Sequence, residues 1–95
     1  MNTQCNRMLK IILNNPQVKY WYAKDFQSGE WFIGYEATAR MSDLLRMHSD
    51  ILIPIKDGRF RAICVNWEKE KEIQDLKEYL KTLEEISNAE VYSNR

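Results

Sequence analysis

The chain has 95 residues, 44% of them hydrophobic and 29% charged, which is enough for one small globular domain and too short for two. Its formal net charge is zero, and no apolar run approaches the roughly 18 residues of a membrane helix, so we expect no transmembrane segment. The first residues show no long apolar stretch before a cleavage site, so we expect no signal peptide and a cytoplasmic protein.

The charge is distributed unevenly along the chain. Residues 1–67 carry nine Lys and Arg against six Asp and Glu, a net of +3, whereas residues 68–95 carry five against eight, a net of −3. A basic body followed by an acidic segment is compatible with a nucleic-acid partner but does not establish one.

The first expected element is a helix over residues 3–14, with Thr3 as its N-cap and Pro16 ending it. Its apolar residues recur at i, i+3, i+4, i+7 and i+8 and are Cys5, Met8, Leu9, Ile12 and Leu13. A short strand over residues 18–23 and a short helix over residues 23–27 follow.

The next helix, in the stretch "GYEATARMSDLLR", has two different faces. The apolar side, which we expect in the core, carries Ala37, Met41, Leu44, Leu45 and His48. The opposite side carries Tyr35, Thr38, Ala39, Ser42 and Arg46, flanked by Glu36 and Asp43. That polar side is either a solvated surface or the contact surface for a ligand.

A β-hairpin is predicted around Asp57-Gly58, a pair typical of a type I′ turn. The strands would be residues 51–56 and 59–65, with Ile55 opposite Phe60. One sheet face is uniformly apolar, is expected to be core, and comprises Ile51, Ile53, Ile55, Phe60, Ala62 and Cys64. The other face carries Lys56, Arg59 and Arg61 around the turn.

The last expected element is a charged helix over residues 68–90. Its apolar seam steps by 3, 4 and 3 residues and consists of Ile73, Leu76, Leu80 and Leu83. The seam either packs on the domain or forms a dimer interface with a second copy. We expect a second copy to cover it at least in part, because the first helix and the hairpin can cover each other.

Few residues suggest chemistry. The two cysteines, Cys5 and Cys64, form no CxxC pair, and we expect buried, reduced thiols, with a disulfide between them as the alternative. We expect Trp21, Trp31 and Trp67 to be core or staple residues. No nucleophile, base and orienting residue stand out together, and there is no Gly-rich phosphate loop, so we expect no enzyme, cofactor, metal or small-molecule ligand.

The stretch "GYEATARMSDLLR" followed by "KDGRF" resembles the small winged helix-turn-helix proteins of bacteria, phages and mobile elements. In that family an "A-R-[I/M/L]-x-[E/D]-L" core opens the second helix of the motif. The resemblance covers residues 3–67 and implies an α+β fold, a three-helix core with a β-hairpin wing, over residues 1–67. A long C-terminal amphipathic helix over residues 68–95 would follow. The loop "SGEWFI" is longer and more aromatic than the family's tight turn, and the helix is less basic.

The resemblance implies that Tyr35–Met47 is a recognition helix and that the Lys56–Phe60 turn is the wing. The chain would then bind double-stranded DNA sequence-specifically, as a regulator or as a replication or mobility factor of a phage or mobile element. Small side chains let a helix approach base edges in the major groove. The expected DNA contacts are Tyr35, Thr38, Ala39, Ser42, Arg46, Lys56, Arg59 and Arg61. The alternative is a protein-interaction module on the same scaffold, with the C-terminal helix as its docking surface, which the zero net charge mildly favours.

Overall fold

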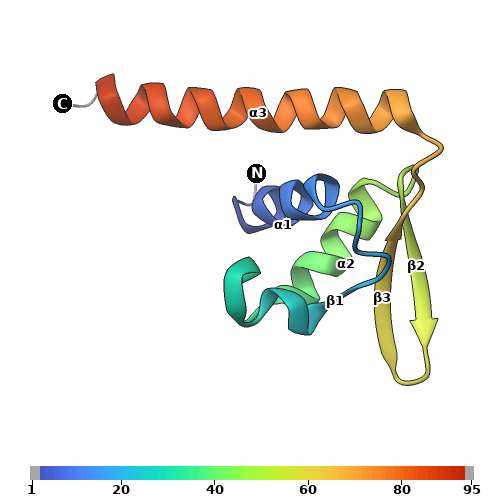
Figure 1. Ribbon diagram of the computed structural model, residues 1–95. Coiled ribbons are helices and arrows are strands. Elements are labelled where there is room, and N and C mark those ends of the chain that lie inside the picture. Colours follow the sequence, from blue (N-terminus) through green and yellow to red (C-terminus); the bar gives the residue numbers. More distant parts are fainter. Residues whose placement is uncertain (1–2, 94–95) are drawn as a thin grey trace.

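The computed structural model describes residues 3–93, without the side chains of residue 57 and residues 85–93. Its elements, in chain order, are the helix α1 (Thr3–Asn14), the strand β1 (Trp21–Tyr22), the 3-10 helices η1 (Ala23–Phe26) and η2 (Gly29–Trp31), the helix α2 (Ala37–Met47), the strands β2 (Leu52–Asp57) and β3 (Phe60–Val65) and the helix α3 (Glu70–Ser93). The fold is α+β, and the expected order of elements is confirmed (Figure 1).

The hydrophobic core forms between α1, α2 and one face of the sheet. The stripe predicted on α1 is confirmed, since Cys5, Met8, Leu9, Ile12 and Leu13 are all buried. From α2, the predicted apolar side contributes Ala37, Met41 and Leu44. Trp21 is fully buried and stacks on Phe26, with ring centroids 5.3 Å apart. Trp67 is exposed, so it is not one of the expected core residues.

The segment between β1 and α2 is built from 3-10 turns rather than from one short α-helix. The ring of Trp31 packs edge-on against Trp21 at 5.0 Å, which anchors this aromatic loop to the core. Gly34 has a φ of +151°, and a Cβ there would lie 2.7 Å from Nε2 of Gln4. That amide donates a hydrogen bond to the Ile33 carbonyl at 3.2 Å. The glycine therefore allows α1 to approach the chain just before α2.

The sheet is antiparallel, with the strand order β1-β3-β2. The hairpin register differs from the expected one: Ile55 pairs with Ala62 rather than with Phe60, and Asp57 pairs with Phe60. The turn is therefore Gly58-Arg59. Gly58 has a φ of +59°, and no described residue other than glycine has a positive φ. A type II′ turn needs a positive φ only at its first central position, which glycine adopts without strain.

The expected core face of the hairpin is confirmed only in part, since Ile51 and Ala62 are buried as predicted but other residues are not. Cross-strand partners share a face, so Ile53, Ile55, Phe60, Ala62 and Cys64 do lie on one side as predicted. However, Ile53 is 41% exposed and Phe60 is 66% exposed. The core lies on the opposite face, where Leu52, Ile63 and Val65 are buried together with Trp21. The helices cover only this second face, at the end of the hairpin that is farther from the turn (Figure 1).

The long helix α3 lies across α1 and extends beyond the rest of the molecule (Figure 1). Ile73 and Leu80 join the core cluster, and Leu76 packs against it. Near the end of the contact, Nζ of Lys10 pairs with the carboxylate of Glu84. Among the described residues, α3 and the other helices are too short or too polar to cross a membrane.

Candidate nucleic-acid interface

The face of α2 that points away from the core carries the small and polar residues singled out from the sequence. Thr38, Ala39, Ser42 and Arg46 are all exposed, whereas Ala37, Met41 and Leu44 are buried. The Ser42 hydroxyl donates a hydrogen bond to the Thr38 carbonyl at 3.3 Å, one turn earlier. The middle of this face is therefore free of bulky side chains, which allows close approach to a flat or grooved partner.

Tyr35 does not belong to the helix that we predicted from it. The helix begins at Ala37, with Glu36 as the N-cap, and Glu36 makes no side-chain capping bond. Tyr35 lies in the preceding turn, is 83% exposed, and packs edge-on against Phe32 with centroids 5.5 Å apart. The Glu36 carboxylate disfavours an anionic partner at the start of α2.

The Asp43 carboxylate forms ion pairs with both arginines of α2, Arg40 and Arg46. Its Oδ1 accepts a hydrogen bond from Nη2 of Arg46 at 2.9 Å, and its Oδ2 lies 3.3 Å from Nη2 of Arg40. Sγ of Cys5 lies 4.0 Å from the same Oδ2. Burial and the nearby Asp43 carboxylate raise the pKa of the Cys5 thiol, although Arg40 and Arg46 oppose the shift. Arg46 is thus exposed but partly neutralised.

The basic residues of the hairpin gather around its turn. Lys56, Arg59 and Arg61 are all exposed, and none of them forms an ion pair with a described side chain. Lys56 and Arg61 are direct cross-strand partners. Like charges directly opposite each other destabilise a sheet. Folding therefore gains nothing from this pair.

The Lys56–Arg61 pair lies on the side of the hairpin that the helices partly cover. Partners alternate between faces, so this pair shares its face with Leu52–Val65 and Pro54–Ile63, the face on which the helices pack. That face is apolar where the helices cover it and basic where the hairpin extends beyond them. The predicted basic residues and the predicted helix thus belong to one side of the sheet.

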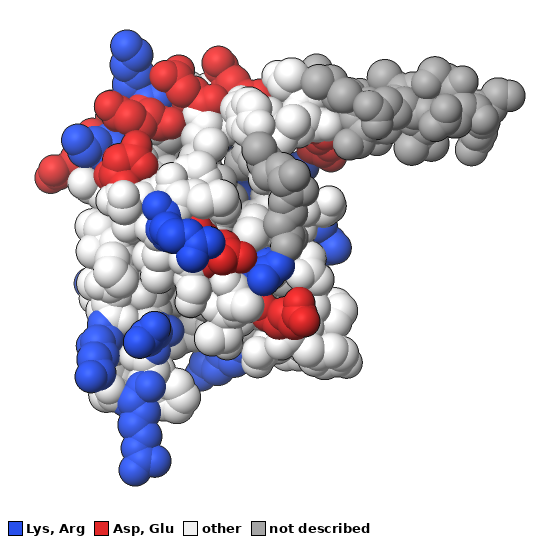
Figure 2. Space-filling model, turned by 180° about the vertical axis from the view of Figure 1, so that it is seen from behind, with Lys and Arg blue, Asp and Glu red and all other residues white. Residues whose placement is uncertain are grey.

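The charges separate along the molecule. Figure 2 shows Lys and Arg gathered at the tip of the hairpin, and Asp and Glu mixed with some Lys over the start of α3 at the other end. The residues that make up the acidic end include Glu68, Glu70, Glu72 and Asp75. A polyanion would therefore be attracted to the hairpin end and repelled from the α3 end.

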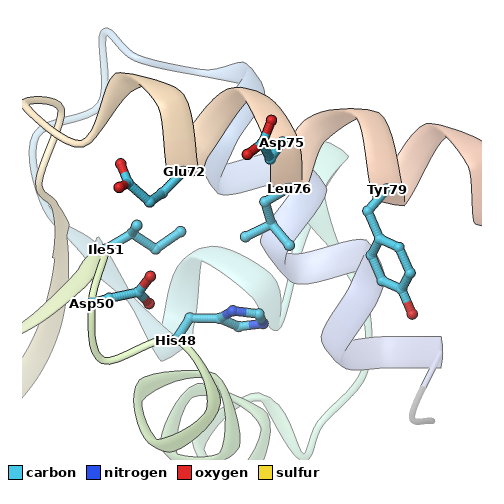
Figure 3. Close-up of a pocket in the computed structure, with 7 residues that line it drawn as sticks. All are labelled: His48, Asp50, Ile51, Glu72, Asp75, Leu76 and Tyr79. Carbon is cyan, nitrogen blue, oxygen red and sulfur yellow. The ribbon is translucent and has the colours of Figure 1, made fainter.

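An open hollow of about 350 Å³ lies between the end of α2 and α3 (Figure 3). Ile51 and Leu76 form its apolar part, and it is lined by His48, Asp50, Ile51, Glu72, Asp75, Leu76 and Tyr79. Burial lowers the pKa of His48, and the Asp50 carboxylate partly offsets this shift. Among the side chains that the structure describes, no group of three His, Cys, Asp or Glu residues is placed to hold a metal ion. The acidic lining disfavours an anionic ligand here.

The seam of α3 is used within the chain. Ile73 and Leu80 are 4% and 6% exposed, because they are covered by the body of the same molecule. These two side chains therefore follow the first of the two alternatives, in which the seam packs on the domain, and a dimer interface there stays a prediction. Leu76 and Leu83 are half-buried. A second hollow of about 350 Å³ beside this contact is lined by Lys10, Leu13, Asn14, Lys77, Leu80, Lys81 and Glu84.

Two features of the candidate interface were not predicted from the sequence. The exposure of Phe60 and the pairing of Lys56 with Arg61 depend on the hairpin register, which the alternation pattern leaves open. The ion pairs Asp43–Arg46 and Arg40–Asp43 could have been predicted from the sequence, because both have the i, i+3 spacing of helical ion pairs. The two cysteines are free, with Cys5 buried as expected and Cys64 only half-buried.

Comparisons of the chain with family models, with curated proteins and with solved structures found no match. What the protein does is therefore inferred from its own residues and their geometry.

Proposed function

We propose that the protein binds double-stranded DNA through a winged helix-turn-helix, with α2 as the recognition helix and the β2–β3 hairpin as the wing. The order of elements and the sheet order β1-β3-β2 are compatible with that layout. In this proposal α2 enters the major groove with Thr38, Ala39 and Ser42 toward the base edges. The protein then acts in the cytoplasm as a regulator, or as a replication or mobility factor of a phage or mobile element.

The observation that carries the proposal is the cross-strand pair of Lys56 and Arg61. A like-charged pair at the end of an exposed hairpin costs stability unless an anion compensates it. Arg59 in the adjacent turn adds a third cation. A phosphate backbone running beside the hairpin would neutralise all three and release the counterions of the DNA.

The proposal is tested by fluorescence anisotropy at low salt with a pool of random duplexes. Arg59→Ala with Arg61→Ala should weaken binding to all duplexes alike and flatten the slope of log affinity against log salt by about 2, because each phosphate contact contributes roughly 0.9. The matched control is Lys69→Ala with Lys71→Ala, which removes the same charge at the acidic end of the molecule. Equal losses in both double variants would contradict the proposed interface.

The role of α2 is tested by Ser42→Glu, which places a carboxylate on the groove side. We expect loss of binding with the fold unchanged, since Ser42 is exposed. Thr82→Glu on α3 is the control, because the Thr82 hydroxyl makes the same bond to the carbonyl one turn earlier, to Glu78 at 3.0 Å. If the wild type binds no duplex even at low ionic strength, DNA binding is excluded.

A second candidate function is a protein-interaction module on the same scaffold. The observation that favours it is the exposed apolar face of the sheet, which includes Ile53 and Phe60. Exposed apolar surface of this kind often marks a protein contact. The C-terminal helix, which we expected to be the docking surface, is the weaker candidate because its seam is half covered by the chain itself. A wild-type protein that does not bind duplex DNA would favour this function.

A further inference from the structure

Phe60 is a large aromatic side chain with no role in the core. It is 66% exposed and lies immediately after the Gly58-Arg59 turn, with Asp57 as its Cα partner. The core cluster of buried and partly buried residues contains no side chain from the turn end of the hairpin. Together with the exposed Ile53 on the same face, Phe60 leaves apolar surface that is available to a partner.

Cations surround this ring on the other sides of the hairpin tip. Arg59 occupies the turn, and Arg61 follows Phe60 on the opposite face, beside its partner Lys56. The tip therefore carries an aromatic ring on one face, two cations on the other and a third cation at the apex. Figure 1 shows this end of the hairpin extending beyond the helices, and Lys56, Arg59, Phe60 and Arg61 are all exposed there.

Strand pairing fixes the position of Phe60 in the hairpin. Cross-strand pairing continues up to the Asp57–Phe60 pair, and the turn has only two residues. Behind Phe60 on the same face lie Ala62 and its partner Ile55, of which Ala62 is 1% exposed and Ile55 is half-buried. The ring is thus presented at a set position rather than on a loose loop.

We propose that Phe60 is an apolar wedge that enters the minor groove and partly unstacks one base step, while Lys56, Arg59 and Arg61 contact the phosphates on either side. The inference rests on the proposed DNA binding and extends it to the mode of contact. A minor groove about 6 Å wide admits side chains but not a pair of strands, so contact falls to the residues at the tip. Apolar wedges of this kind kink the duplex toward the major groove.

This contact has a consequence for the DNA sequence that is bound. Flexible pyrimidine–purine steps such as TA and CA unstack at the least cost. The wedge therefore selects for such a step at a fixed distance from the bases that α2 faces. That selection adds specificity at a position where no hydrogen bond to a base edge is made.

The test uses the full chain and duplexes that carry 2-aminopurine next to a TA step, together with end-labelled duplexes that report bending by energy transfer. The wild type should raise the 2-aminopurine fluorescence and shorten the end-to-end distance. Phe60→Ala should abolish both signals and weaken binding roughly 5- to 160-fold, the range for loss of one base–aromatic contact. Phe60→Leu should restore part of both signals, because an aliphatic side chain can also act as a wedge.

Ile53→Ala is the matched control, since Ile53 is exposed on the same sheet face but lies nearer the body of the protein. It should leave bending and affinity unchanged. Binding by Phe60→Ala with normal bending would overturn the wedge and leave DNA binding intact, as would equal losses in Phe60→Ala and Ile53→Ala. Tighter binding to single strands than to duplexes would overturn the wedge in favour of stacking on unpaired bases. Failure of the wild type to bind any duplex would overturn the proposed function as well.

Discussion

Asp43 accepts a hydrogen bond from Arg46 at 2.9 Å and lies 3.3 Å from Arg40, so one carboxylate stands between the two arginines of α2. On a surface proposed to meet DNA, this carboxylate has two opposing effects. It orders Arg46 at the end of the exposed helix face, and it cancels part of the positive charge that phosphates would attract.

Asp43→Asn should therefore raise the affinity for all duplexes severalfold and steepen the salt dependence by about one unit, because one cation becomes free to replace a counterion. Anisotropy titrations over a range of salt concentrations measure both effects. Glu78→Gln, which removes a carboxylate from the exposed side of α3, is the control and should change neither. A loss of affinity in Asp43→Asn would mean that ordering of Arg46 outweighs its neutralisation.

The type II′ turn predicts that substitutions at Gly58 and at Arg59 have different effects on the stability of the protein. Gly58→Val should destabilise the protein by about 1–3 kcal/mol, because a β-branched residue resists the φ of +59° found there. The cost is conformational, since a Cβ at Gly58 would meet no atom within 4 Å. Arg59→Val is the matched control, and its effect should be much smaller because φ at Arg59 is not positive. Urea unfolding compares the two, and equal effects would contradict the type II′ assignment.

The burial of His48 predicts that the protein is less stable toward unfolding in mild acid. Burial lowers its pKa below the usual 6.5, so the folded protein resists a proton that the unfolded chain accepts. The unfolded state then binds more protons below pH 6.5, and stability decreases as the pH falls from there to the folded-state pKa. Asp50 on its own segment and Glu72, Asp75 and Tyr79 on α3 line the same hollow.

His48→Gln should flatten this dependence, because glutamine does not titrate. The measurement is the free energy of unfolding by urea at about pH 7.5 and about pH 5.5 for both proteins, a range that spans the usual histidine pKa. The wild type should lose more stability over this range than the variant. An equal loss in the two proteins would assign the pH dependence to other groups.

The burial of the α3 seam predicts that it stabilises the single chain. Leu80→Ala should cost about 2–4 kcal/mol, the usual range for a buried leucine, and the half-buried Leu83→Ala should cost less. If Leu80 were instead a dimer contact, the unfolding midpoint would rise with protein concentration. Sedimentation of the wild type alongside unfolding at two concentrations separates the two cases.

The sequence by itself was sufficient for the elements whose pattern has only one solution. The α1 stripe from Cys5 to Leu13 has a helical period and one apolar side, so the end of the helix at Asn14 and its buried residues were confirmed. The two sides of α2 were predicted for the same reason, and its face of Thr38, Ala39, Ser42 and Arg46 is exposed. Only its start was misplaced, because no side chain caps the helix at Glu36 to mark it.

The hairpin shows what only the tertiary structure decided. A shift of the register by two residues leaves every side chain on the same face, so alternation cannot distinguish Ile55–Phe60 from Ile55–Ala62. Both faces also carry apolar residues, and the helices cover the face of Leu52 and Ile63 rather than that of Ile53. Likewise, the apolar sequence pattern of the α3 seam is the same whether α1 or a second copy covers it. The local pattern determines which residues share a face, whereas the packing of distant elements determines which face is buried. Because the helices pack on the other face, Phe60 is exposed beside the cations of the hairpin.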